Sequence, residues 1–102
     1  MSNAIYFVSF KLKKGASVPD FLQAAKNLND EFISKQPGYV SWKQMVDGET
    51  WADVLTFETM DDLKHFEKVS SEPSETALKF YSFLNMNSCK GHQFLVERSY
   101  RL

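Results

Sequence analysis

The segment of residues 5–13 is apolar on both faces of an extended strand, and this feature constrains the fold more than any other. One face would carry Tyr6, Val8, Phe10 and Leu12, and the opposite face would carry Ile5 and Phe7. A strand with two apolar faces needs a covering layer on each of them. The chain must therefore place other elements, or a second protein surface, on both sides of this strand.

A helix is predicted to begin at Ser17. Asp20 follows Ser17 at the spacing of a capping box, which supplies acceptors for the first backbone N–H groups of a helix. The apolar residues that follow recur at steps of three and four and form one stripe: Val18, Phe21, Leu22, Ala25, Leu28, Phe32 and Ile33. Pro37-Gly38 cannot continue the helix, so its amphipathic part ends before residue 37.

The remaining chain contains a hairpin, two more helical segments and a last strand. Residues 39–46 and 50–58 are strands joined by the tight-turn signal Asp47-Gly48. Thr59 with Asp62 repeats the cap spacing and opens a short helix that buries Leu63, Phe66 and Val69. The segment 71–74 contains a proline and interrupts this helix, so a further helix is predicted at 73–84 and a final strand at 91–100.

This order of elements predicts an α+β fold of the ferredoxin-like β-α-β-β-α-β type, with residues 1–102 as a single domain. Right-handed crossovers would give a four-stranded antiparallel sheet with its helices on one side. The second face of the first strand then has no cover within the chain. A second copy of the sheet is the simplest cover, so we expect a homodimer whose functional cavity is built by dimerising.

Composition narrows the class of partner. The formal charge of −1 offers no positive field for nucleic acid or an anionic membrane. One cysteine, no secretion signal and no run of roughly 20 apolar residues point to a cytoplasmic protein. Residues 2–4 resemble the remnant of an expression tag and receive no function. Aromatic residues make up 15% of the chain, which favours a pocket or a subunit interface for a small hydrophobic or aromatic molecule.

The chain resembles the dimeric α/β-barrel superfamily, and within it the antibiotic biosynthesis monooxygenase-like domains. Three stretches carry the resemblance: 36–39 after the first helix, the Asp47-Gly48 hairpin, and 54–63, which has the strand, aromatic residue and short helix of the family. The resemblance implies a cofactor-independent oxygenase of an aromatic substrate, a haem-degrading enzyme, or a protein without known activity.

Departures from the family pattern argue against haem. The family often has a Trp where Phe57 stands and a His where Phe66 stands, with His65 one position out of register. One residue turns a helical side chain by about 100°, so His65 is not an equivalent. The helix at 73–84 contains no histidine to serve as an axial ligand. No cofactor is therefore expected.

Asp53 is the candidate catalytic residue. It shares a strand face with Trp51, Leu55 and Phe57, so it is a carboxylate in an apolar row. Burial there would raise its pKa toward the value of a general base, which could remove a phenolic proton and leave an anion that reacts with oxygen. The alternative is that Asp53 reaches solvent or pairs with Lys43 across the hairpin.

The other candidates are substrate-binding residues, and each has a structural alternative as a core or edge residue. They are Tyr6, Trp42, Gln44, Trp51, Phe57, Tyr81 and His92. No metal site is expected, because only two histidines occur and no cluster of metal-ligand spacing is present. Cys89 has no neighbouring base, and no glycine-rich phosphate loop occurs.

These features leave the activity open between classes. The first hypothesis is a cofactor-independent monooxygenase that acts on a small aromatic or hydrophobic substrate, with Asp53 as base. The alternative is a non-catalytic dimer that binds a ligand or serves a regulatory or structural role. Fold does not decide between them, because one fold carries unrelated functions.

Overall fold

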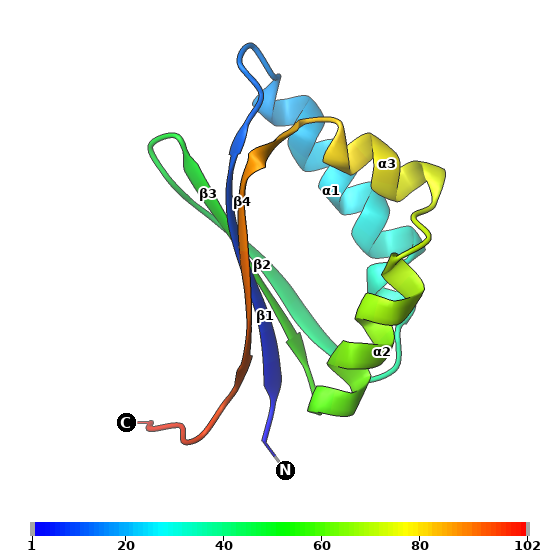
Figure 1. Ribbon diagram of the computed structural model, residues 1–102, viewed down its shortest axis with the longest axis vertical. Helices are drawn as coiled ribbons and strands as arrows, with labels where there is room; N and C mark the ends of the chain where they lie inside the picture. The colour runs from blue at the N-terminus through cyan, green and yellow to red at the C-terminus, as the bar shows by residue number, and fades with distance from the viewer. Residues whose placement is uncertain (1, 102) are drawn as a thin grey trace.

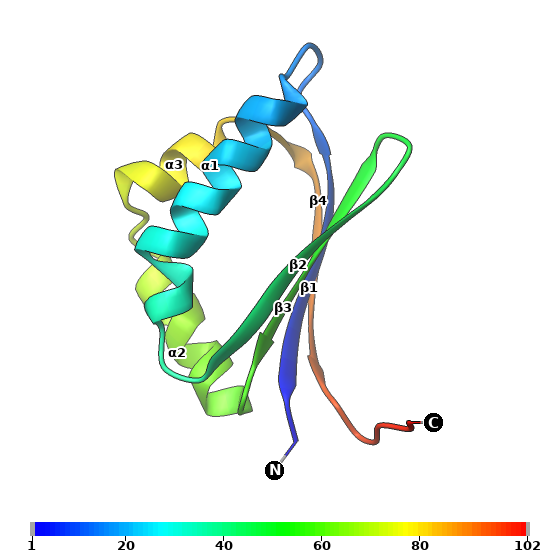
Figure 2. The same cartoon turned by 180° about the vertical axis from the view of Figure 1, so that it is seen from behind.

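Four strands form one antiparallel sheet in the order β2-β3-β1-β4 in the computed structural model, which describes residues 2–101. The strands are β1 (Ala4–Leu12), β2 (Tyr39–Asp47), β3 (Thr50–Phe57) and β4 (Leu84–Leu95). The helices are α1 (Val18–Glu31), α2 (Met60–Ser70) and α3 (Glu75–Tyr81), with a 3₁₀ turn at Ile33–Lys35. All helices lie on one face of the sheet (Figures 1 and 2). The predicted ferredoxin-like topology is confirmed.

Side-chain caps start all three helices. The hydroxyls of Ser17 and Thr59 accept hydrogen bonds from backbone N–H groups three residues on, over 3.3 and 3.1 Å. Ser74 does the same for α3 over 3.2 Å. The predictions at Ser17 and Thr59 are confirmed. Before β2, the chain turns at Gly38, whose φ of 75° and close approach to the Asp62 side chain leave no room for a Cβ atom.

The second half of the chain differs from the prediction at its boundaries. Helix α3 ends at Tyr81, and β4 begins at Leu84 rather than at residue 91. The β1–β4 register shifts between the pairs Lys11–Asn85 and Ser9–Lys90, so residues 86–89 form a bulge. The polar residues of this bulge interrupt the alternation that identifies a strand, which explains the wrong boundary. Ser88 Oγ accepts the Lys11 backbone N–H over 2.8 Å and so replaces a ladder partner.

Two groups of aromatic rings join the helices to the sheet. The Phe21 cluster consists of Phe10, Phe21, Trp51, Phe80 and Phe83, with ring centroids 5.1–6.1 Å from that of Phe21. The Phe57 cluster consists of Phe32, Tyr39, Phe57 and Phe66 near the opposite ends of β1 and β3. Many of the aromatic residues expected in a pocket or interface therefore serve the core.

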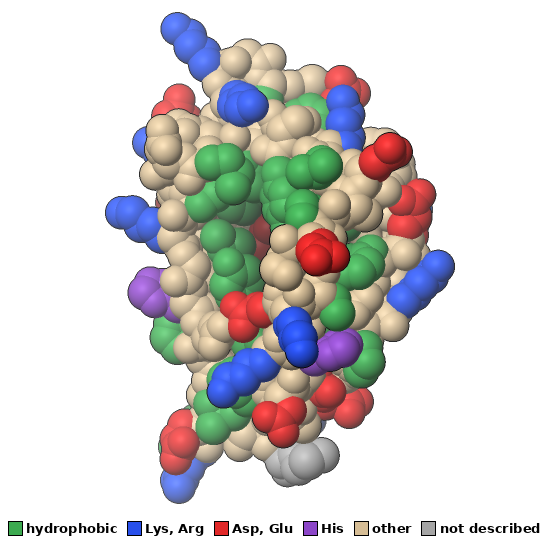
Figure 3. All heavy atoms as spheres, turned by 45° about the vertical axis from the view of Figure 1, so that its right-hand side comes forward, with side chains coloured by type: hydrophobic (Ala, Val, Ile, Leu, Met, Phe, Trp, Pro, Cys, Tyr) green, Lys and Arg blue, Asp and Glu red, His purple; other side chains and the backbone are tan. Residues whose placement is uncertain are grey.

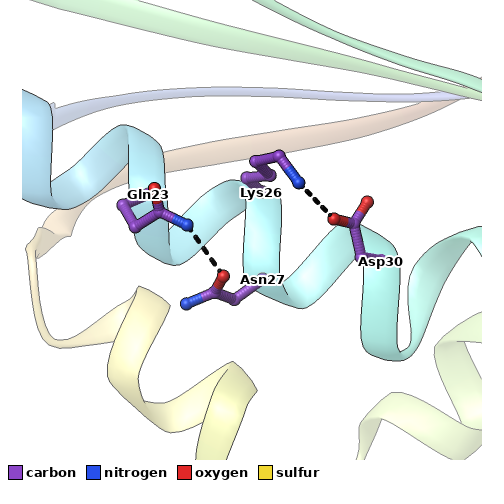
Figure 4. A network of polar contacts seen from close by, with 4 residues as sticks. All are labelled: Gln23, Lys26, Asn27 and Asp30. Atoms are coloured by element: carbon purple, nitrogen blue, oxygen red, sulfur yellow. Dashed lines mark hydrogen bonds and ion pairs between the residues drawn. The ribbon is translucent and has the colours of Figure 1, made fainter.

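The opposite side of α1 is solvated. Gln23 donates to Asn27 over 2.9 Å, and Lys26 pairs with Asp30 over 2.6 Å, both at the i, i+4 spacing (Figure 4). Exposed pairs of this kind add little to stability. Leu22, which was predicted to lie in the buried stripe, is 41% exposed. The stability of α1 therefore depends on its aromatic face.

We predict that Phe21→Ala lowers the free energy of unfolding by about 3–5 kcal/mol, because a fully buried ring that contacts four other rings is lost. Urea unfolding followed by circular dichroism measures this. The matched control is Leu22→Ala on the same helix, which should cost less than about 1 kcal/mol. Equal losses in the two variants would contradict the role of the Phe21 cluster.

Candidate functional site

A cavity of about 260 Å³ lies between the helices and the sheet of a single chain. Its walls are mostly apolar and include Val8, Leu28, Leu55, Phe66, Phe80 and Leu84. Figure 3 shows hydrophobic side chains gathered around a hollow on the side where this cavity opens. One chain therefore supplies a lined cavity on the helix side of its sheet, whereas the cavity expected from the sequence was one built by dimerising.

The two aromatic clusters explain why a cavity forms at this place. Phe10 and Phe80 of the Phe21 cluster bound it at one end, and Phe66 of the Phe57 cluster bounds it at the other. Between them β1 and β3 present Val8, Asp53 and Leu55, which are smaller than an aromatic ring, while Tyr6 and Trp42 stand at the sides. The bulky rings hold the two layers apart, and the shorter side chains cannot fill the space between the clusters.

Asp53 lies in the floor of this cavity. Its side chain is 6% exposed, and Oδ1 is buried without a hydrogen-bond partner among the described residues. Burial raises the pKa of the Asp53 carboxyl to about 7, and the neighbouring Trp42 and Gln44 side chains act in the opposite direction. The alternative in which Asp53 reaches solvent or pairs with Lys43 is wrong. Lys43 pairs with Val54 and points to the other face of the sheet.

Gln44 and Trp42 flank Asp53 on β2. Gln44 is the direct cross-strand partner of Asp53, and its buried Nε2 has no hydrogen-bond acceptor among the described residues. Trp42 lines the cavity and packs edge-on against Phe80 at 5.6 Å. The Gln44 amide thus lies close enough to the Asp53 carboxyl to favour its ionised form, although neither Gln44 Nε2 nor Asp53 Oδ1 reaches full hydrogen-bond geometry with a described residue. A ligand or water that satisfies these two atoms would recover part of the cost of burying them, about 1–3 kcal/mol for each.

Three other ionisable side chains line the same cavity, namely Tyr6, Tyr81 and Cys89. Burial, followed by the charge of Glu67, raises the pKa of the Tyr6 phenol. Burial likewise raises the pKa of Tyr81. Burial and then the Asp53 charge raise the pKa of the Cys89 thiol, so it is held in the protonated, weakly nucleophilic form. None of the described lining residues is Lys or Arg.

The structure separates the other predicted site residues from the cavity. Trp51 and Phe57 are buried core residues that pack in the two aromatic clusters and do not line it. Gln44 stands beside Asp53 but is not a lining residue. His92 pairs with Phe7 on the opposite face of the sheet, where its ring stacks on Phe94 at 5.7 Å. Of the eight candidates, Tyr6, Trp42, Asp53 and Tyr81 share the cavity.

Sequence reasoning missed the contribution of β4. The bulge brings Met86 and Cys89 into the cavity wall, and residues before position 91 were not expected to be strand. Gly91 lies under the Tyr6 ring, where a Cβ atom would be 2.8 Å from the phenol oxygen. A single glycine within a strand pattern signals such a close approach and could have indicated this contact.

Two further classes of feature are not found between residues 2 and 101. No group of three or more His, Cys, Asp or Glu side chains is placed to hold a metal ion. No helix there has the length and hydropathy needed to cross a membrane.

The cavity offers a carboxyl that titrates near neutral pH and two phenols in an apolar space. This arrangement can accept a proton from a small, flat, mostly apolar ligand.

Comparison with known proteins gives matches among solved structures only. No family model and no curated protein sequence matches the chain. A variant of SnoaB, a cofactor-independent oxygenase from Streptomyces nogalater, is 12% identical with a TM-score of 0.74 over 97% of each chain. A monooxygenase from the gene ActVA-Orf6 of Streptomyces coelicolor, in complex with Nanaomycin D, is 13% identical with a TM-score of 0.69, over 99% of this chain and 92% of that chain.

A Bordetella bronchiseptica protein provisionally named an antibiotic biosynthesis monooxygenase is also 13% identical, with a TM-score of 0.74 over 99% of this chain and 100% of that chain. At such identities the likeness shows the fold alone. The resemblance to antibiotic biosynthesis monooxygenase-like domains is thereby confirmed at the level of the fold.

We predict that Asp53 makes the protein less stable as the pH rises. The pKa of Asp53 is raised in the folded state from 3.8 to about 7, so the folded state binds more protons between these values and loses stability across them. At 1.36 kcal/mol per pH unit, the loss approaches about 4 kcal/mol at pH 8. Urea unfolding of the wild type and Asp53→Asn between pH 4 and pH 8 isolates this contribution.

The difference in unfolding free energy should turn in favour of Asp53→Asn as the pH rises. A constant difference across this range would mean that Asp53 is ionised in the folded protein throughout and has an ordinary pKa. Asp47→Asn, which changes an exposed carboxylate on β2, is the matched control and should follow the wild type.

Proposed function

We propose that the protein is a homodimeric, cofactor-independent monooxygenase of a small aromatic or hydrophobic substrate, with Asp53 as the general base. One observation carries this proposal. Asp53 is the carboxylate in the floor of an apolar cavity, has a pKa of about 7, and has a buried oxygen without a partner. A base of that pKa is half ionised near neutral pH, where it combines adequate basicity with availability. The cytoplasmic location expected from the sequence is part of the proposal.

The proposed chemistry begins with proton transfer. Asp53 takes a proton from a phenolic or other acidic group of the ligand and leaves an electron-rich anion. Dioxygen then forms a bond to the activated carbon, and the peroxide anion takes the proton back from Asp53. The resulting hydroperoxide eliminates water to leave a carbonyl. One oxygen atom enters the product, and the other leaves as water. The apolar walls favour this order because they keep water away from the anion and hold a flat ring in place.

The cavity size limits the substrate. A volume of about 260 Å³ lies below the range of roughly 300–1,000 Å³ that is usual for drug-sized ligands. A ligand of one or two rings therefore fits best. Trp42 and Phe80 offer ring edges and faces to such a ligand, and Tyr81 offers a phenol O–H without a partner among the described residues.

The proposed dimer rests on the other face of the sheet. Ile5, Phe7 and Val54 form an apolar centre there, and no helix of the described chain covers it (Figures 1 and 2). Phe94 and Met45 at its margins are 52% and 45% exposed. A second sheet packed on this face would bury these side chains. The dimer would then support the sheet from behind while each chain keeps its own cavity.

The proposal predicts that Asp53 acts as a base on a planar probe. The probe is 5-nitrobenzisoxazole, two fused rings whose ring opening needs only a base: the carbon-bound proton goes to the carboxylate, the N–O bond breaks, and a coloured cyanophenolate forms. We expect turnover that rises with pH and is half-maximal near pH 7, followed by absorbance. Asp53→Asn should lower the rate by about 100-fold or more, whereas Asp47→Asn should not change it.

Oxygenase activity is measured separately as oxygen uptake with a panel of one-ring and two-ring phenols. Consumption of one dioxygen per ligand, abolished in Asp53→Asn, is the expected result. Binding of these phenols with no oxygen uptake would favour the non-catalytic ligand-binding protein instead. Loss of base activity in Asp47→Asn as well would show that the probe reports surface carboxylates and would remove the support for Asp53.

For the dimer, we predict a solution mass near twice 11.8 kDa by light scattering at micromolar concentration. Val54→Lys places a charge at the centre of the uncovered face and should give a monomer. Leu78→Lys is the control, because Leu78 is 54% exposed on α3 and lies on the helix side. A monomeric wild type would exclude the homodimer.

A further inference from the structure

The cavity around Asp53 contains an acidic group and no counter-charge. Asp53 is the only Asp or Glu among its described lining residues, and no Lys, Arg or His side chain is among them. The carboxyl is 6% exposed, and its Oδ1 has no hydrogen-bond partner within the described chain. Buried carboxylates are normally paired, because the removal of their charge from water is costly. The cavity therefore lacks the cation that would compensate its own acidic group.

Aromatic rings form much of the remaining wall. Trp42 and Phe80 have ring centroids 5.6 Å apart and planes at 76°, and the centroids of Phe80 and Tyr81 are 5.9 Å apart with planes at 65°. Rings at such steep angles border a space from different directions, and the face of an aromatic ring attracts a cation. The other aromatic lining residues are Tyr6, Phe10 and Phe66. A carboxylate among aromatic rings is suited to an ammonium group.

The strand register brings one of these rings next to the carboxyl. Trp42 and Gln44 share the cavity side of β2, and Gln44 is the direct partner of Asp53. Trp42 is therefore a diagonal neighbour of Asp53, at a distance that a large side chain can reach. Burial raises the pKa of the carboxyl, and the Trp42 and Gln44 side chains act against it as hydrogen-bond donors. Both side chains are uncharged, so the charge of an ionised Asp53 stays uncompensated.

We propose that the cavity binds a small protonated aryl-alkyl amine, with its ammonium group on Asp53 and its ring against Trp42 and Phe80. An ammonium group has three N–H donors. Asp53 Oδ1 is an open acceptor for one of them, and Tyr81 adds a phenol oxygen in the same cavity. This ligand class goes beyond the proposed function. The amine would exclude the substrate and pair with the base, so its effect as an inhibitor, though not its binding, rests on the proposed role of Asp53.

Charge distinguishes an amine from other classes of ligand. An anion would add a second negative charge beside an ionised Asp53, and a neutral ligand would leave that charge unpaired. A protonated amine supplies the missing positive charge in a space whose apolar walls weaken the screening by water. Loss of its hydration opposes binding, and the faces of the surrounding rings replace part of that hydration. The desolvation of Asp53 occurs on folding, so it does not count against the ligand.

A second carboxylate stands outside the cavity. Tyr6 also lines a solvent-open surface depression of about 580 Å³ together with Glu67, Gly91, His92 and Gln93. The Gln93 amide donates a hydrogen bond to Glu67, which is only partly buried. An amine on Glu67 would meet water and an occupied carboxylate, and exposed ion pairs contribute little. Asp53 is therefore the stronger site, and Glu67 is its matched control.

The pairing makes amine binding depend on pH through Asp53. The titratable groups that share the cavity are Tyr6 on β1, Tyr81 on α3 and Cys89 on β4, and burial raises the pKa of each, so all three stay neutral between pH 6 and pH 8. Among the described residues, α1, α2 and β2 place no titratable side chain in it. With a pKa of about 7 for Asp53, a bound amine displaces about 0.9 proton at pH 6 and about 0.1 at pH 8. Its affinity should therefore rise about tenfold between these pH values, because the amine itself stays protonated.

Isothermal titration calorimetry with 2-phenylethylamine tests this, and 2-phenylethanol is the neutral ligand of the same shape. Titrations at pH 6 and pH 8 in two buffers of different ionisation enthalpy give both the affinity and the number of protons released. We expect the amine to bind more tightly at pH 8, with proton release at pH 6, and the alcohol to show neither effect. Asp53→Asn should weaken amine binding by about 10-fold or more at pH 8, whereas Glu67→Gln should bind as the wild type.

Amine binding that is absent at millimolar concentration, releases no proton at pH 6 or is unchanged in Asp53→Asn would overturn the proposal. Loss of binding in Glu67→Gln alone would also overturn it, because the amine would then occupy the surface depression. The same amine should compete with 5-nitrobenzisoxazole in the wild type, and turnover that the amine does not inhibit would place it elsewhere. Amine binding without any turnover of that probe overturns the role of Asp53 as a base and leaves the amine site intact, whereas turnover without amine binding does the reverse.

Discussion

The separation between helices and sheet is the constraint on which the rest of the structure depends. Aromatic rings set it at both ends of the interface, through the Phe21 cluster at one end and the Phe57 cluster at the other. Interiors pack to high density only where side-chain volumes match the space between layers. Between the clusters the sheet carries Val8, Asp53 and Leu55, which are too short to reach the helices, and the cavity is the result.

Asp53 occupies the part of the interface that packing leaves open. Removal of the carboxyl from water disfavours its ionised form, and no described cation compensates. The folded protein is therefore less stable near neutral pH, where the carboxylate is partly ionised. In return, the apolar cavity contains a base. Natural proteins accept such a loss where function depends on it, which is why a strained or unpaired polar group indicates a functional site.

Helix α2 links the cavity to the surface on the β4 side. The hydrogen bond between Gln93 and Glu67 holds α2 against the edge strand, and Tyr6 lines the surface depression together with these two residues. The bulge in β4 contributes the remaining wall, because its extra residues turn Met86 and Cys89 toward the cavity. A surface depression and an inner cavity therefore share a single phenolic side chain as their boundary.

Local sequence determined the elements and their order. The caps at Ser17 and Thr59, the turn at Asp47-Gly48 and the alternation along β3 act over a few residues, so they can be recognised without the fold. The alternation along β3 also put Asp53 and Leu55 on one face, and the structure places Tyr6 and Tyr81 in the cavity that this face lines. Only the tertiary structure decided which face of the sheet the helices cover around a cavity, because that depends on the packing of residues distant in sequence. It likewise decided that Trp51 and Phe57 fill the core, that His92 lies on the opposite face, and that the β4 bulge brings Cys89 and Gly91 to the cavity side. Strand register and side-chain volume across three elements produce these results, and no local pattern in a single segment encodes them.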